Sequence, residues 1–291
     1  MKSLIERLIV RCIIPVVWLA LPGHSFPAAQ EAAARFHHVH LNSTHPAAAI
    51  EWYTRTFPVT SRASVAGYDG IASEQIHLLF TRTTKPPLAT LDSAIWHFGW
   101  GSPDMATDYA MHQNNGVKFA TPLSTLPQGT VFAYMNGPDG ALVEINSAPT
   151  RAFLHVHLYS ERPLCTADWY ERRLGATRRG TPRKEGEPCD LPYAVPTEPL
   201  GVIRSPAATV RFGDISLIIY PRQRPGSLTP SPGHVVDHLA LAVADLAGTL
   251  KRLEGAGVKV LRGVHTFGQG PGTAALIEGP DSIAIELVER P

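Results

Sequence analysis

Three short segments of this sequence carry residue types that bind metals. His38 lies in HHVHL, His97 in WHFGW and Glu144 in ALVEIN, and apolar residues alternate around each of them as in a β-strand. Side chains on a strand alternate between its two faces, so three such strands curving around one concavity would bring two imidazoles and one carboxylate together. This 2-His-1-carboxylate set leaves coordination positions open for a substrate and suits Fe2+, Mn2+ or Zn2+, with Ni2+ also open.

The same three residue types return later in the chain, because the sequence is an internal duplication. HVHL at residues 38–41 recurs at 155–158, an offset of 117 residues, and His97 matches His238 at an offset of 141 residues. The change of offset places an insertion in the second copy, at the Pro-rich run 184–206. The second predicted set of metal ligands is His155, His238 and Glu286. We therefore expect metal binding in at least one of the two copies.

Each copy also divides into two halves of similar layout. A strand is followed by a helix with apolar residues at helical spacing and then by further strands, and the pattern restarts at AIWHFGW. The sequence thus predicts four β-α-β-β-β modules of the α+β class, in tandem domains at residues 36–147 and 152–290. We expect neighbouring modules to pair, so that modules 1 and 2 form one domain. The linkers at 82–93 and 221–233 also allow module 1 to pair with module 4.

Composition limits what the protein can be. The chain has 291 residues, of which 44% are hydrophobic, a formal charge of +1 and no run of basic residues, which argues against a nucleic-acid-binding scaffold. Residues 1–29 resemble a signal peptide, because three basic residues precede an apolar stretch at 12–21 that is too short to span a membrane. We expect a periplasmic or secreted protein, with an uncleaved N-terminal anchor as the alternative. Cys165 and Cys189 remain in the mature chain, either paired or as free thiols.

Longer motifs around the predicted ligands resemble a known superfamily. HHVHLNS before a helix with WY, WHFGW before a GV-ended helix, and YMNGPDGALVEIN are similar to the vicinal oxygen chelate superfamily over residues 36–290. That superfamily includes glyoxalase I, fosfomycin-inactivating thiol transferases, extradiol dioxygenases and bleomycin-binding proteins. The resemblance implies a cup-shaped, eight-stranded mixed sheet in each domain. It also implies metal-ligand positions at His38, His97, Glu144, His155, His238 and Glu286.

Three further residues are candidates for catalysis in the first copy. His77 lies near a position where glyoxalase I carries another ligand, Tyr134 begins a motif that resembles the end of the dioxygenase signature, and His40 could share the cup with His38. The alternatives are an exposed strand residue, a packed aromatic ring and a structural hydrogen bond, respectively. The second copy has Ser216 and Leu276 at the positions that match His77 and Tyr134. We therefore expect the first copy to be the working site.

The resemblance implies two function classes. The first is a divalent-metal-dependent enzyme that acts on a small oxygen-rich substrate chelated to the metal, by dioxygenase chemistry or by glyoxalase-like lyase or isomerase chemistry. The second is a metal-free protein that sequesters a small molecule, as bleomycin-binding members do. In both cases the partner is a small molecule, and the sequence leaves a homodimer open.

Overall fold

The protein is described here by a computed structural model. The described residues are 33–74, 76–88, 92–192, 206–222 and 226–290. The predicted signal peptide lies outside these ranges. Among the described residues, no helix is long and apolar enough to cross a membrane.

The first copy of the repeat forms two modules, each with the predicted order of one strand, one helix and three strands. Module 1 consists of β1 (Arg35–Ser43), α1 (Pro46–Thr56), β2 (Ser61–Val65), β3 (Tyr68–Ser73) and β4 (Ile76–Arg82). Module 2 consists of β5 (Ile95–Ser102), α2 (Met105–Asn114), β6 (Ser124–Thr125), β7 (Val131–Asn136) and β8 (Leu142–Ser147). The first and last strands of each module lie side by side and parallel.

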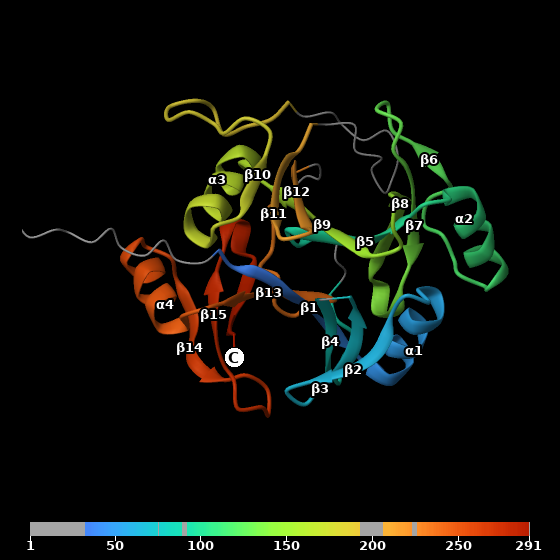
Figure 1. The fold of residues 1–291 in the computed structure, drawn as a ribbon, viewed down its shortest axis with the longest axis horizontal. Coiled ribbons are helices and arrows are strands. Elements are labelled where there is room, and N and C mark those ends of the chain that lie inside the picture. Colours follow the sequence, from blue (N-terminus) through green and yellow to red (C-terminus); the bar gives the residue numbers. More distant parts are fainter. Residues whose placement is uncertain (1–32, 75, 89–91, 193–205, 223–225, 291) are drawn as a thin grey trace, which may run out of the picture. The chain divides into compact units, whose positions relative to one another are not determined.

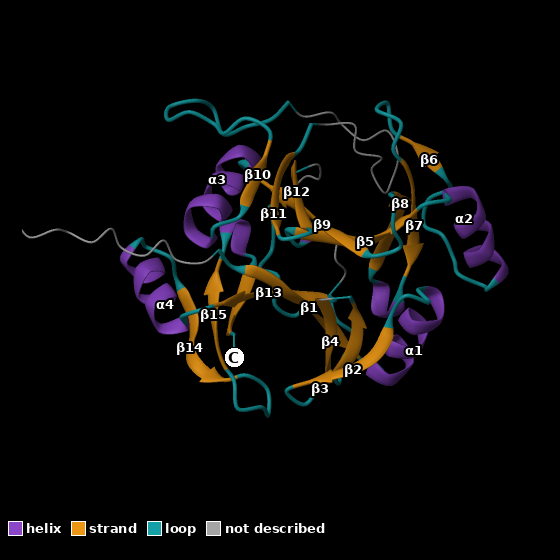
Figure 2. Ribbon diagram, viewed as in Figure 1, coloured by secondary structure: helices purple, strands orange, loops and turns teal. Residues whose placement is uncertain are grey.

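The second copy forms modules 3 and 4 with the same layout. Module 3 consists of β9 (Phe153–Ser160), α3 (Pro163–Leu174), β10 (Thr177–Arg179), β11 (Ala208–Phe212) and β12 (Ile215–Pro221). Module 4 consists of β13 (Val236–Val243), α4 (Leu246–Gly255), β14 (Val260–Thr266), β15 (Thr273–Glu278) and β16 (Ala284–Glu289). Figure 2 shows the helices outside the curved strands. The four-module prediction is confirmed. Most of the predicted insertion, residues 193–205, lies outside the described residues.

The prediction that neighbouring modules pair is wrong. Within the described chain, modules 1 and 4 form one eight-stranded mixed sheet, and modules 2 and 3 form another. In the first sheet β1 is antiparallel to β13, and in the second β5 is antiparallel to β9. Figure 1 shows this directly, since the blue strand β1 lies beside the orange strand β13. The sequence repeat and the sheets therefore divide the chain differently.

The lengths of the connections explain this pairing. Only residues 148–152 join β8 to β9, so β9 has little freedom to leave the sheet that contains β5 and β8. The longer segments between β4 and β5 and between β12 and β13 cross from one sheet to the other. The two longer linkers are compatible with either pairing of the modules, and the short central connection decides between them.

Matched residues begin the helices in the two copies. Pro46 and Pro163 occupy the first turn of α1 and α3, where the missing N–H breaks no helical hydrogen bond. Asp104 and Asp245 cap α2 and α4, because each side chain accepts a hydrogen bond from a backbone N–H of the first turn. The duplication thus preserves local helix signals as well as strand residues.

The Cys165 and Cys189 side chains form a disulfide. It links α3 to the segment that follows β10. Of the two alternatives left by the sequence, pairing is the one that the structure has.

Trp100 connects the two sheets through the core. Its fully buried indole stacks on Phe57 of module 1 at 4.0 Å between ring centroids, meets Phe153 of module 3 edge-on at 5.1 Å, and donates a hydrogen bond to the Ser73 hydroxyl at 3.2 Å. One side chain from β5 therefore packs against elements of both sheets.

Replacing Trp100 by Ala should lower the free energy of unfolding by about 3–5 kcal/mol, because a large cavity would open where the two sheets meet. Trp100→Phe should cost less, since most of the ring contacts remain. Urea unfolding monitored by circular dichroism measures both. Equal decreases in the free energy of unfolding for the two variants would contradict the packing role. The lost hydrogen bond to Ser73, which both variants remove, would then account for the whole effect.

Candidate functional site

The modules bring the predicted ligands together in new combinations. The predicted sets His38, His97, Glu144 and His155, His238, Glu286 are each split between two sheets. Modules 1 and 4 gather His38, His40, His238 and Glu286, which we call the outer-module centre. Modules 2 and 3 gather His97, Glu144, His155 and His157, which we call the inner-module centre. Each centre therefore takes residues from both copies of the repeat.

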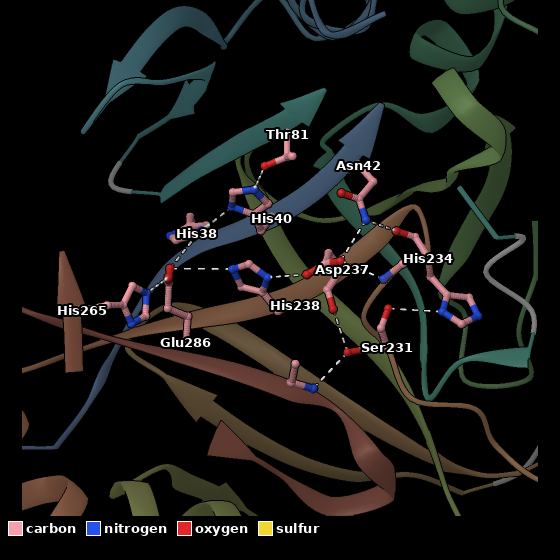
Figure 3. Close-up of polar contacts among 12 residues, drawn as sticks. His38, His40, Asn42, Thr81, Ser231, His234, Asp237, His238, His265 and Glu286 are labelled. Atoms are coloured by element: carbon pink, nitrogen blue, oxygen red, sulfur yellow. Dashed lines mark hydrogen bonds and ion pairs between the residues drawn. The ribbon is translucent and has the colours of Figure 1, made fainter. Parts of the chain in front are cut away.

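Strand register builds the outer-module centre. His38 on β1 pairs with Ala240 on β13, which pairs with Glu286 on β16, so these positions form one row across the sheet. The Nε2 atom of His38 lies 3.5 Å from Oε2 of Glu286, and Nε2 of His238 lies 3.7 Å from the same oxygen. The Nδ1 atom of His40 lies 3.4 Å from His38 Nε2, while its Nε2 contacts the Thr81 hydroxyl at 2.8 Å. Figure 3 shows His38 and His238 directed toward Glu286, with His40 between His38 and Thr81.

Two atoms of this centre have no hydrogen-bond partner in the described structure. Both Oε2 of Glu286 and Nε2 of His238 are buried, and the distance between them is too long for a hydrogen bond. Buried polar atoms are nearly always paired in folded proteins. A divalent cation between them would supply the missing interaction, so the donor set fits a metal of the kind that the sequence predicted.

The inner-module centre is more tightly closed. Oε2 of Glu144 lies 2.7 Å from His97 Nε2, 3.2 Å from His155 Nε2 and 3.8 Å from His157 Nδ1. All four residues are buried. Gly99 pairs with Glu144 on one neighbouring strand and with His155 on the other. An added Cβ at Gly99 would lie 2.8 Å from the His155 ring. A glycine at this position is therefore required for His155 to approach Glu144.

Burial and neighbouring charge set the protonation of the inner-module centre. Burial alone would raise the pKa of Glu144, but the imidazoles of His155 and His157 hold it well below its usual range. Burial lowers the pKa of His97 and lowers that of His157 further. The carboxylate is thus ionised and these imidazoles are neutral, which are the forms that bind metals.

The outer-module centre differs because one of its histidines, His238, carries a second ring proton and is therefore positively charged near pH 7. Burial and the neighbouring imidazoles lower the pKa of His38 strongly and that of His40 to about 3. Burial also opposes the charge on His238, but Asp237 and Glu286 raise the pKa of His238 to about 9. Metal binding at this centre must therefore displace a proton from His238.

The three predicted catalytic residues do not share one site. His77 pairs with His38 in the register of β1 and β4, is partly buried, and belongs to the outer-module centre with His40. Tyr134 pairs with Glu144 and its ring lies 4.8 Å from that of His97, so it belongs to the inner-module centre. Burial, followed by the Glu144 charge, raises the pKa of Tyr134 far above its usual value. The expectation that the first copy forms the working site is therefore wrong, because His77 and Tyr134 lie in different sheets and each centre takes residues from both copies.

Four contributors were missed by sequence reasoning. They are His37, Trp96, Asp237 and His265. The first three occupy β-bulges, where an extra residue turns toward the face that alternation assigns to its neighbour. His265 on β14 places Nε2 3.8 Å from Oε1 of Glu286. The doublets His37-His38 and Asp237-His238 were the available signal, but strict alternation assigns the first member of each to the opposite face.

Comparisons with known proteins agree with this architecture. Residues 35–145 and 152–287 match the family model of the Glyoxalase/Bleomycin resistance protein/Dioxygenase superfamily. Among solved structures, the chain is similar to glyoxalase I from Zea mays, with a TM-score of 0.66 and 16% identity over 88% of this chain and 92% of that one. It is also similar to a Bacillus subtilis protein described as a "putative dioxygenase", with a TM-score of 0.57 and 17% identity over 90% of this chain and 87% of that one. At these identities the likeness shows the fold alone. A search of curated protein sequences gave no match.

Acid should destabilise the metal-free protein through its histidines. Seven of them have pKa values below the usual 6.5, with burial as the first cause: His37, His38, His40, His77, His97, His112 and His157. Below pH 6.5 the unfolded chain binds protons that these folded-state imidazoles reject, so acid favours unfolding. The pKa of His238 is shifted in the opposite direction, so its contribution to the stability of the folded state is lost only as the pH rises through about 9. The melting temperature of chelator-treated protein should fall steadily from pH 7 to pH 5. A constant or rising value would contradict this assignment.

Gly99→Ala should damage the inner-module centre selectively. The new Cβ would press against the His155 ring and the Glu144 carbonyl oxygen, each 2.8 Å away, and displace a proposed ligand. Metal analysis should show loss of binding at the inner-module centre and retention at the outer one. Ala240→Gly, at the matching position of the other sheet, is the control and should keep binding at both centres. Unchanged metal content in Gly99→Ala would rule out His155 as a ligand.

Proposed function

Because this chain belongs to the Glyoxalase/Bleomycin resistance protein/Dioxygenase superfamily, we propose that it is a divalent-metal-dependent enzyme that acts on a small oxygen-rich substrate. The reaction is dioxygenase chemistry or glyoxalase-like lyase or isomerase chemistry. The observation that carries the proposal is the buried outer-module centre, where Glu286 Oε2 and His238 Nε2 face each other without hydrogen-bond partners.

The ligand roles follow from the two centres. In the outer-module centre His38, His238 and Glu286 would hold the metal, and His40 offers a further nitrogen through Nδ1. In the inner-module centre the matching ligands are His97, His155 and Glu144, with His157 beside them. When bound, the metal supplies a Lewis acid that stabilises negative charge on two neighbouring substrate oxygens. The strands hold the ligand side chains in place before substrate arrives.

Proton transfer requires groups other than the ligands. His77 lies next to His38 across the β1 and β4 pair, and its buried Nδ1 has no hydrogen-bond partner in the described structure. Because burial lowers its pKa, this imidazole is neutral near pH 7 and able to accept a proton. We assign His77 as the general base of the outer-module centre. Tyr134 remains protonated, so it cannot act as a general base, but its hydroxyl can donate a hydrogen bond in the inner-module centre.

We infer that the outer-module centre is the working one. Its carboxylate has an oxygen without a hydrogen-bond partner in the described structure, and His77 and His265 supply additional imidazoles around the centre. In the inner-module centre the Glu144 oxygen is already within hydrogen-bonding distance of His97 and His155. That internal pairing competes with a metal for the Glu144 oxygen, so we expect the inner-module centre to bind a metal more weakly than the outer-module centre.

Export is part of the proposal. The basic and then apolar N-terminal sequence supports a periplasmic or secreted location, and the disulfide between Cys165 and Cys189 is the kind of bond that persists in oxidising compartments. Mass spectrometry of the protein recovered outside the cytoplasm tests this. Removal of about the first 29 residues is expected, and an intact N-terminus would support an uncleaved anchor.

Glu286→Gln and Glu144→Gln separate the candidate functions. Protein purified without chelators is analysed for Fe, Mn, Zn and Ni, and turnover is measured on a panel of catechols, α-ketoaldehydes and hydroxy acids. Glu286→Gln should lose the metal of the outer-module centre and all turnover, because a charged ligand is replaced by a neutral amide. Glu144→Gln should keep turnover.

The outcomes against the proposal are equally specific. Loss of turnover in Glu144→Gln alone would make the inner-module centre the enzyme site. Metal-free protein that binds members of the panel without turnover would support sequestration instead.

A further inference from the structure

The same position of the repeat is a β-bulge in both sheets, but its residue differs. Between β1 and β13, His40 pairs with His238 and the next registered pair is Leu41 with Val236, so Asp237 is the extra residue. Between β5 and β9, Trp96 is the extra residue next to His97. A bulge lets two successive side chains serve one face of a sheet. The sequence therefore places a carboxylate beside the first-strand histidine in one centre and an indole beside it in the other.

Asp237 makes a specific contact with His238. Its Oδ1 lies 2.8 Å from Nδ1 of His238. The second oxygen, Oδ2, accepts hydrogen bonds from Nδ2 of Asn42 at 2.8 Å and from the backbone N–H of Gly233 at 2.8 Å. The Asp237 carbonyl accepts a hydrogen bond from the Ser231 hydroxyl at 2.7 Å. Figure 3 shows this carboxylate between Asn42 and the His238 ring. Its orientation is therefore fixed on both sides.

The contact determines which nitrogen of His238 faces Glu286. A carboxylate accepts from Nδ1–H, so the nitrogen that loses its proton and offers a lone pair to a metal is Nε2, which lies 3.7 Å from Glu286 Oε2. The inner-module centre lacks this arrangement. Nδ1 of His97 is buried and has no partner among the described residues, and the Trp96 ring lies 4.1 Å from the His97 ring.

We propose that Asp237 is a positioning residue that fixes the tautomer and ring orientation of His238 and makes the outer-module centre the tighter of the two metal sites. The inference rests on the proposed function in one respect, that the outer-module centre holds a divalent metal. Histidine ligands of metal sites commonly donate their second N–H to a carboxylate, and loss of that partner typically weakens metal affinity by about 10- to 100-fold.

Co2+ is the probe for metal affinity. Each variant is made in the full chain carrying Glu144→Gln, so that the visible absorption of bound Co2+ reports on the outer-module centre. Asp237→Ala should weaken Co2+ binding by about 10- to 100-fold. Asp237→Asn should lose less, because its amide oxygen still accepts from Nδ1–H. Asp245→Ala removes a carboxylate that only caps α4 in the same module, and it should leave the Co2+ affinity unchanged.

A second measurement does not depend on metal. Nitrogen-15 NMR of the metal-free protein, recorded above pH 9 so that the His238 ring is neutral, should show the ring proton on Nδ1 in the parent. The His238 signal is identified by its absence from the spectrum of His238→Gln. In Asp237→Ala the ring should become a mixture of tautomers. An unchanged tautomer in Asp237→Ala overturns the positioning role, and this readout needs no Co2+, so it remains available even if Asp237→Ala is too unstable for titration at high Co2+. Asp237→Asn should keep the parent's tautomer, because its amide oxygen still accepts from Nδ1–H.

The two proposals fail in different ways. If the Glu144→Gln parent binds no Co2+, the proposed function is wrong for the outer-module centre, while the NMR experiment still tests the role of Asp237. If the parent binds Co2+ and Asp237→Ala binds it equally well, the positioning role is overturned and the metal site stands. Co2+ binding to the inner-module centre, measured in a Glu286→Gln background, should not respond to Asp237→Ala. An equal loss there would mean a general structural defect and would also overturn the proposal.

Discussion

The antiparallel pairing of first strands from different modules is the constraint on which both centres depend. β1 meets β13 and β5 meets β9, and each pair places a histidine from one copy beside a histidine from the other. The carboxylate lies on the last strand of module 4 or module 2, and that strand is parallel to the first strand of the same module. A change in this pairing would leave His38 without Glu286 and His155 without Glu144. The sites are consequences of sheet topology, and the helices and core serve to hold that topology.

Bulges add a second level of control. In a regular strand, successive residues point to opposite faces, so a metal ligand and its immediate neighbour cannot act together. The bulges at His37 and Asp237 suspend this rule in the outer-module centre, where Nδ1 of His37 lies 2.7 Å from Nδ1 of His38. Trp96 occupies a bulge in the inner-module centre and stacks on Tyr159 at 4.9 Å. One inherited backbone feature therefore supports a polar surrounding in one centre and an aromatic surrounding in the other.

Local features could be predicted from the sequence, and their assembly could not. The duplication, the four modules and the six candidate ligand positions follow from repeated motifs and strand alternation, and these are properties of neighbouring residues. The choice of modules that share a sheet depends on contacts between residues such as His40 and His238, which lie far apart in the chain. The alternation of apolar residues along one strand does not indicate such contacts. The placement of His77 and Tyr134 in separate centres was missed for the same reason. Asp237 was missed because a bulge changes the direction of a side chain without changing the residues around it.

The pairing of module 1 with module 4, and of module 2 with module 3, also limits how the two copies of the repeat can diverge. Each centre contains strands from both copies, so a substitution in one copy affects only one part of one centre. Ser216, which matches His77 in the repeat, pairs with His155 and thus modifies the inner-module centre. Leu276, which matches Tyr134, pairs with Glu286 and modifies the outer-module centre. The outer-module centre therefore keeps His77 and lacks the tyrosine, while the inner-module centre keeps Tyr134 and lacks the extra histidine. Two chemically different sites arise from one duplicated ligand set, and neither copy can supply a complete site without the other.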